Sequence, residues 1–149
     1  MNYWLMKSEP TDYSIDALAK DKTIDWYGIR NYQARNFMRD DMKIGDLAFF
    51  YHSNCKEPGI VGIMKVCKLA YPDKLQFKKD HKYYDPKSDP KNPRWLNVDM
   101  GFVRKTKLVS LNEIRNYPEL SKMKILQKGN RLSITPVSRA EWDFINKYT

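Results

Sequence analysis

The sequence contains few of the residues that build common metal and redox centres: two cysteines and two histidines occur among 149 residues. Cys55 and Cys67 are twelve positions apart, which fits neither a disulfide framework nor a Cys-x-x-Cys pair. A reducing, cytoplasmic compartment is therefore expected. His52 and His81 have no metal-ligand neighbour at a usual spacing, so both are interpreted as ordinary polar residues. We expect no metal and no cofactor.

Several sequence signatures are also absent. There is no Walker loop, Gly-x-Ser-x-Gly elbow, Gly-x-Gly-x-x-Gly fingerprint or His-Glu-x-x-His pair. Uncharged runs such as residues 47–55 are far shorter than the ~20 apolar residues of a membrane-spanning helix. The chain enters Tyr3-Trp4-Leu5-Met6 without a basic or apolar leader, so no signal peptide is expected. These absences favour a non-catalytic protein that does not contact membranes.

Positive charge and aromatic residues are abundant. Lysine and arginine number 27 against 18 acidic residues, a formal charge of +9, and 13% of residues are aromatic. Residues 71–107 contain ten Lys or Arg and five acidic residues, and therefore hold +5 of this excess. Phe77, Tyr83, Tyr84 and Trp95 of this segment offer faces on which bases stack, at ~1–3 kcal/mol per base. The alternative, a solvated lysine loop whose aromatics cover the sheet, stays open.

Hydrophobic periodicity predicts a mixture of strands and short helices. Strands are expected at residues 2–6, 23–26, 47–52, 59–69, 94–104 and 131–135, and helices at residues 14–19, 31–39, 110–118, 122–127 and 138–145. Ser14, Ser110 and Ser138 occupy N-cap positions, the last two with capping-box spacing. Trp4, Trp142 and Cys67 are predicted to be core residues.

The proline-rich segment 71–93 is predicted to be a long loop, and loops of this length are usually functional or mobile. The predicted strands and helices follow no regular βαβ period. We therefore expect one α+β domain over residues 1–149, with a largely antiparallel, barrel-like sheet.

Five segments resemble the EVE domain family in order along the chain: residues 3–10 (YWLMKSEP), 26–36 (WYGIRNYQARN), 50–54 (FYHSN), 58–62 (PGIVG) and 131–138 (RLSITPVS). The resemblance implies a PUA-like fold, a bent and mostly antiparallel β pseudo-barrel with several short helices, related to YTH, ASCH and PUA domains. It also implies nucleic-acid binding through a modified base, chiefly a modified cytosine in DNA, with a modified RNA base as the other possibility.

In the related YTH domains an aromatic cage holds a methylated adenine, and the resemblance places the corresponding pocket near Lys7, Ser8, Trp26 and Asn54. Which of Phe77, Tyr83 and Tyr84 forms the opposite wall is left open, because the long loop differs from that of the relatives. Further base-binding candidates are Arg30, Asn31, Tyr83, Tyr84 and Ser133, and phosphate-binding candidates are Arg35, Lys78, Lys79 and Lys82.

These residue types suit recognition of an extruded base, which costs a few kcal/mol to unstack. Trp26 offers the largest stacking face, Ser8 and Asn54 can hydrogen-bond a base edge, and Lys7 or Arg30 can meet an acceptor or a phosphate. The alternative for Trp26 is a core position. We predict a cleft that faces the long loop, with Lys7 and Ser8 at its floor and Trp26 and Asn54 in its walls.

Three other functions fit the sequence less well. A hydrolase like some ASCH relatives would use Lys7 as base or nucleophile, although the neighbouring Glu9 would hold that lysine protonated. A small-molecule or nucleotide sensor could use the same pocket, and a protein-interaction module is the third alternative. Steep salt dependence would distinguish nucleic-acid binding from the sensor. A monomer is expected.

Overall fold

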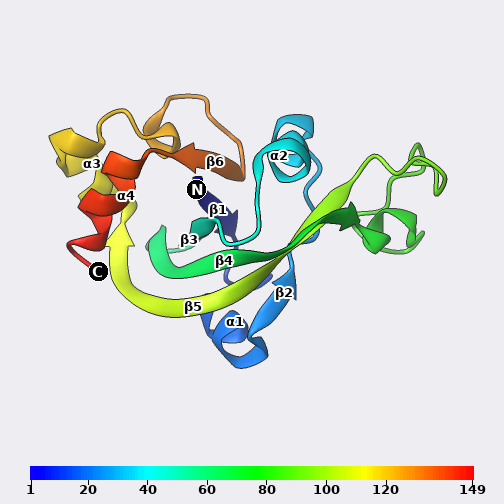
Figure 1. Cartoon of the computed structure of the whole chain (residues 1–149), viewed down its shortest axis with the longest axis horizontal. Helices are drawn as coiled ribbons and strands as arrows, with labels where there is room; N and C mark the ends of the chain where they lie inside the picture. The colour runs from blue at the N-terminus through cyan, green and yellow to red at the C-terminus, as the bar shows by residue number, and fades with distance from the viewer.

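The structure, a computed structural model, describes residues 1–149. Its strands are β1 (Tyr3–Ser8), β2 (Thr23–Asp25), β3 (Leu47–His52), β4 (Gly59–Pro72), β5 (Leu96–Ser110) and β6 (Ile134–Val137) (Figure 1). Its α-helices are α1 (Ile15–Asp21), α2 (Tyr32–Asn36), α3 (Leu111–Asn116) and α4 (Arg139–Asn146). A π-helical turn η1 (Phe37–Asp41) follows α2, and 3-10 turns are η2 (Lys74–Phe77), η3 (Pro118–Leu120) and η4 (Lys124–Leu126).

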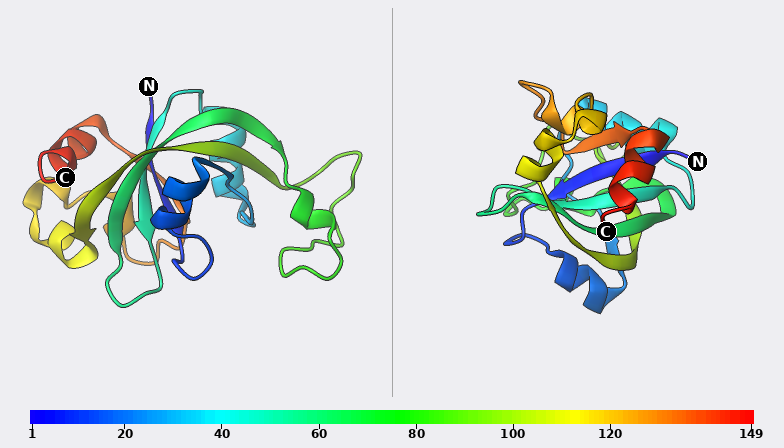
Figure 2. Two further views of the ribbon diagram at one scale, coloured as in Figure 1. Left: turned by 90° about the horizontal axis from the view of Figure 1, so that it is seen from below. Right: turned by 90° about the vertical axis from the view of Figure 1, so that its left-hand side faces the viewer.

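All six strands form one sheet in the order β2-β5-β4-β3-β1-β6. Every neighbouring pair is antiparallel except β1 and β3, which run parallel. The long strands β4 and β5 curve strongly, and α3 and α4 lie at one end of the molecule (Figures 1 and 2). The predicted α+β class with a bent, mostly antiparallel sheet and short helices is confirmed. The sheet is not closed, because its edge strands β2 and β6 do not pair with each other.

Two hydrophobic cores pack on the sheet, and β1 contributes to both. Trp4 and Met6 belong to a cluster that includes buried residues of α1 and α2, whereas Leu5 belongs to a cluster with α3 and α4. Successive strand side chains point to opposite faces, so a strand covered on both sides serves two cores. The predictions that Trp4 and Trp142 are core residues are confirmed, since both are buried.

The predicted helix starts are also confirmed. Ser14, Ser110 and Ser138 each accept a hydrogen bond from the backbone N–H three residues further on. At α4 the Glu141 carboxylate also accepts a hydrogen bond from the backbone N–H of Ser138, and the two bonds together form a capping box.

Some predicted boundaries and one predicted core residue are wrong. The helix expected over residues 31–39 changes at residue 37 into η1. The last strand begins at Ile134, because the Asn130 side chain accepts from the N–H of Leu132 and closes a turn there. Cys67 is exposed, not core. Its neighbour Val66 faces the first core, so Cys67 points to the opposite, uncovered face of β4.

Most of the predicted long loop is organised. β4 extends into its start as far as Pro72, η2 follows directly, and β5 begins just beyond its end at Leu96. The buried Gln76 amide donates to the carbonyl oxygens of Asp73 and Trp95 and accepts from the Ser88 hydroxyl and the Trp95 N–H. This hub gives the segment between β4 and β5 its own polar core, although the segment projects from the body of the protein (Figure 2).

Candidate functional site

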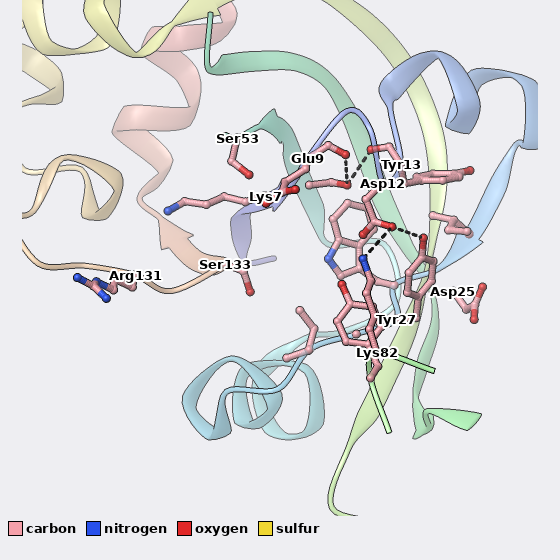
Figure 3. Close-up of a pocket in the computed structure, with 16 residues that line it drawn as sticks. Lys7, Glu9, Asp12, Tyr13, Asp25, Tyr27, Ser53, Lys82, Arg131 and Ser133 are labelled. Carbon is pink, nitrogen blue, oxygen red and sulfur yellow. Dashed lines mark hydrogen bonds and ion pairs between the residues drawn. The ribbon is translucent and has the colours of Figure 1, made fainter. Parts of the chain in front are cut away.

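A cavity of about 430 Å³ lies where the end of β1, the connection from β2 to α2, the β4–β5 segment and the approach to β6 meet (Figure 3). Its volume falls in the range of small-ligand sites. It is lined by Lys7, Ser8, Glu9, Asp12, Tyr13, Ile24, Asp25, Trp26, Tyr27, Gly28, Ile29, Ser53, Lys82, Tyr83, Arg131 and Ser133.

The end of β1 brings Lys7 and Ser8 to this cavity. The Ser8 hydroxyl donates to the carbonyl oxygen of Tyr13 at 2.7 Å, so toward a ligand it retains acceptor capacity only. Burial lowers the pKa of the Lys7 ammonium, which forms no ion pair. Glu9 forms no ion pair with Lys7: its carboxylate accepts a hydrogen bond from the Asn54 amide at 3.2 Å.

Trp26 is both a core residue and part of the cavity lining. Its side chain is 6% exposed and belongs to the first core, where its ring meets that of Phe50 edge-on at 5.4 Å. The indole N–H of Trp4 donates to Asp46, whereas that of Trp26 makes no hydrogen bond to another group of the chain. Trp26 can therefore present an unused donor to a ligand.

The β4–β5 segment contributes Lys82 and Tyr83 to the lining, and neither Phe77 nor Tyr84. Tyr83 lies directly over Gly28, which has a φ of +81°. A Cβ at Gly28 would lie 2.6 Å from Cζ of the Tyr83 ring, much closer than two carbon atoms can approach. Glycine at this position therefore permits both the backbone turn and the placement of the ring.

Arg30 fixes Tyr83 in place. Its guanidinium donates two hydrogen bonds to the carbonyl oxygen of Tyr83, at 3.1 and 2.9 Å, and one to the Asp73 carboxylate at 3.1 Å. The buried Asp73 also accepts from the Gly28 N–H at 2.9 Å. Arg30 is not among the lining residues, so its contacts make it a brace between the two chain segments that form this wall.

Asp12, Tyr27 and Lys82 form a polar cluster on one side of the cavity, and the Lys7 side chain points toward the other side (Figure 3). The Asp12 carboxylate accepts from the Tyr27 hydroxyl at 3.4 Å and lies 3.9 Å from the Lys82 ammonium. Burial and the Asp12 charge raise the pKa of Tyr27 to about 12, and the same two causes raise the pKa of Tyr83. Both phenols are therefore protonated at neutral pH, and Tyr27 donates its proton to Asp12.

Several predicted site residues lie outside the cavity. The Asn31 side chain accepts from the Ala34 N–H and caps α2, and Asn54 and Tyr84 do not line the cavity. The Arg35 guanidinium donates to the carbonyl oxygen of Arg94. Lys78 and Lys79 are exposed on the projecting segment. The predicted residues that do come together are Lys7, Ser8, Trp26, Lys82, Tyr83 and Ser133.

Sequence reasoning missed ten of the sixteen lining residues. Tyr27 adjoins the predicted Trp26, and Ser53 adjoins the predicted Asn54, so their position beside strand ends was a usable signal. Arg131 likewise lies two positions before the predicted Ser133, whereas Asp12 carries no such local signal and reaches the cavity only through the fold.

The open, bent sheet with short helices defines an α+β module of the PUA-like type, and its cavity is of a size to hold a small ligand. The EVE domain family model matches residues 2–148, and the chain belongs to the EVE domain family. Human thymocyte nuclear protein 1 is 46% identical over 163 residues, a match that covers 97% of this chain and 72% of the human protein. None of the helices is both long enough and apolar enough to span a membrane.

Solved structures give the same assignment. A hypothetical protein from Leishmania major superimposes with a TM-score of 0.94 at 45% identity, covering 99% of this chain and 93% of that one. The crystal structure of human THYN1 protein in complex with 5-methylcytosine-containing DNA gives a TM-score of 0.93 at 45% identity, covering 99% and 96%. An ASCH protein from Zymomonas mobilis, at 8% identity and a TM-score of 0.54, shares the fold alone.

Proposed function

We propose that this chain is a non-catalytic DNA-binding module that holds a modified cytosine, turned out of the duplex, in the cavity described above. The observation that carries the proposal is a small cavity with aromatic and polar walls in a chain 45% identical to a human protein whose structure contains 5-methylcytosine DNA. The formal charge of +9 favours a polyanionic partner.

The lining residues suit an extruded cytosine. Extruding the base from the duplex costs a few kcal/mol, and stacking it on Trp26 or Tyr83 stabilises the complex by ~1–3 kcal/mol. The Ser8 hydroxyl, which has only acceptor capacity left, matches the exocyclic amino group of cytosine, a donor. The indole N–H of Trp26 can serve an acceptor on the same base.

The apolar part of the lining suits the methyl group. Ile24 and Ile29 both line the cavity. Burying one additional methyl group is worth ~0.8 kcal/mol, which corresponds to a preference of roughly fourfold over unmodified cytosine at 1.4 kcal/mol per decade. A preference of this size is what contact with the methyl group alone would produce.

Fluorescence anisotropy with paired duplexes, identical except for one 5-methylcytosine, tests the proposal at two salt concentrations. We expect both affinities to fall steeply with salt while their ratio stays near fourfold, because phosphate contacts do not read the base. Equal affinities for the two duplexes would refute base recognition. Salt-independent binding of free 5-methylcytidine without any preference among duplexes would favour the small-molecule sensor instead.

The non-catalytic part of the proposal is tested by recovering the methylated duplex after incubation and analysing its bases. We expect them unchanged. Loss or conversion of the modified base would establish the hydrolase alternative, for which the shared fold of the distant ASCH protein provides no support by itself.

A further inference from the structure

A second hollow, of about 400 Å³, lies beside the cavity between α2 and the segment that leads from η4 to β6. We call it the 124–132 groove, because most of its lining comes from residues 124–132. Lys124, Lys128 and Arg131 line it together with amide side chains that include Gln33, and no carboxylate is among its lining residues. Polar donors and positive charge thus dominate this hollow.

The chain around the groove has an unusual charge pattern. Residues 120–140 contain five Lys or Arg and no Asp or Glu, and of these five only Arg139 forms an ion pair, with Asp143. Lys124, Lys128 and Arg131 are exposed and form no ion pair. By contrast, five acidic residues are interspersed in residues 71–107, and Lys82 of that segment is within ion-pair distance of Asp12. Nearby carboxylates therefore neutralise less of the positive charge in the groove than in residues 71–107.

The groove backbone is held in place by its own hydrogen bonds. The Asn130 amide donates to the carbonyl oxygen of Lys124 at 2.8 Å, and its oxygen accepts from the N–H of Leu132 at 2.9 Å. The backbone N–H groups of Gln127 and Asn130 donate to Lys124 and Gln127 respectively, which closes successive turns. A loop ordered in this way loses little conformational entropy when it binds a ligand.

The groove and the cavity adjoin each other, because they share one lining residue. Arg131 lines both hollows. Two residues further on, the carbonyl oxygen of Ser133 accepts from the Lys7 N–H at 2.8 Å, which ties this segment to the strand end at the cavity floor. A polymer with one unit in the cavity can thus continue past Arg131 into the groove.

We infer that the 124–132 groove binds the phosphodiester backbone next to the extruded base, with Lys124, Lys128 and Arg131 contacting phosphates. This inference rests on the proposed function and adds to it the path of the bound strand. It also places backbone contacts outside the projecting β4–β5 segment, where the sequence had suggested Lys78 and Lys79.

The test compares three double variants in the paired-duplex assay: Lys124→Gln with Lys128→Gln, Lys78→Gln with Lys79→Gln, and a control, Lys20→Gln with Lys65→Gln. The control removes the same charge from exposed lysines that line neither hollow. For the groove variant we expect the slope of log affinity against log salt to become shallower by about 1.8, at 0.9 per phosphate contact. Its preference for the methylated duplex should stay at the wild-type value.

Each outcome separates the two proposals. A groove variant with the slope of the control, in a protein that still prefers the methylated duplex, overturns the groove and leaves the proposed function intact. A wild-type protein without preference, whose salt slope nevertheless depends on Lys124 and Lys128, overturns base recognition and supports the groove. A protein that binds no duplex overturns both. A slope change in the Lys78 and Lys79 variant alone would return the backbone contacts to the projecting segment.

Discussion

Replacing Gly28 by alanine should disturb the cavity wall through a single methyl group. The new Cβ would lie 2.6 Å from Cζ and 2.7 Å from Cε2 of the Tyr83 ring. Arg30 holds the backbone of Tyr83, so the ring has to move relative to that anchored backbone. Gly45→Ala is the matched control, because Gly45 has a similar φ of +89° and no atom within 4 Å of the added Cβ.

Both substitutions place an L-residue in the left-handed region, which costs ~1–2 kcal/mol. At ~2–4 °C per kcal/mol for a chain of this length, each variant should lose ~2–8 °C in Tm. Only Gly28→Ala displaces Tyr83. If the ring stacks on the bound base, its displacement removes ~1–3 kcal/mol, or roughly 5- to 150-fold in affinity.

Thermal unfolding and anisotropy with the methylated duplex measure the two effects separately. We expect both variants to melt at lower temperature and only Gly28→Ala to lose affinity. In a Tyr83→Ala background the Gly28→Ala change should have no further effect on affinity, because the clashing ring is gone. Folded Gly28→Ala protein with wild-type affinity would refute the assignment of Tyr83 to the binding wall.

Three further predictions follow from the geometry. Ser8→Ala should weaken binding of methylated and plain duplexes by a similar factor, because the cytosine amino group that Ser8 would accept from is present in both; paired anisotropy titrations should show an unchanged ratio. Trp26→Ala should lose ~3–5 kcal/mol of unfolding free energy in urea, because the ring is in the core. Trp26→Phe retains an aromatic ring and should fold stably but bind the methylated duplex more weakly. Burial lowers the pKa of His52, whose Nε2 accepts from the Ile15 N–H, so the unfolded state binds more protons between that lowered pKa and 6.5. Stability should therefore fall as pH decreases below 6.5, and urea unfolding of His52→Gln should show a flatter pH profile.

The features predicted correctly from the sequence are those set by neighbours along the chain. Ser138 and Glu141 cap the same helix turn, and Trp4 is buried at a strand position, as predicted. The family resemblance placed Lys7, Ser8 and Trp26 in one region, and all three line the cavity.

The features that the sequence could not reveal depend on distant partners. Arg30 resembled a ligand-binding residue, but Asp73 and the Tyr83 carbonyl, 43 and 53 positions away, engage its guanidinium. Asn31 likewise resembled a base-contacting amide and caps a helix. The charge count drew attention to residues 71–107, although residues 120–140 carry the same net charge of +5 in a shorter stretch, and a count does not show which cations are neutralised by contact.

Arg30 and Asp73 bear on affinity although neither needs to touch the ligand. Each group that becomes ordered on binding lowers the affinity. A cavity wall that is already ordered before the ligand binds therefore retains more of the stacking energy. Arg30 supplies that brace with three hydrogen bonds across the wall, and the Gln76 hub orders the segment that carries Tyr83. The same fixed wall explains why one methyl group at Gly28 should matter. A mobile Tyr83 could move away from the new methyl group without loss of affinity. Because Arg30 holds its backbone, the Tyr83 ring can move only into the cavity or by breaking those hydrogen bonds.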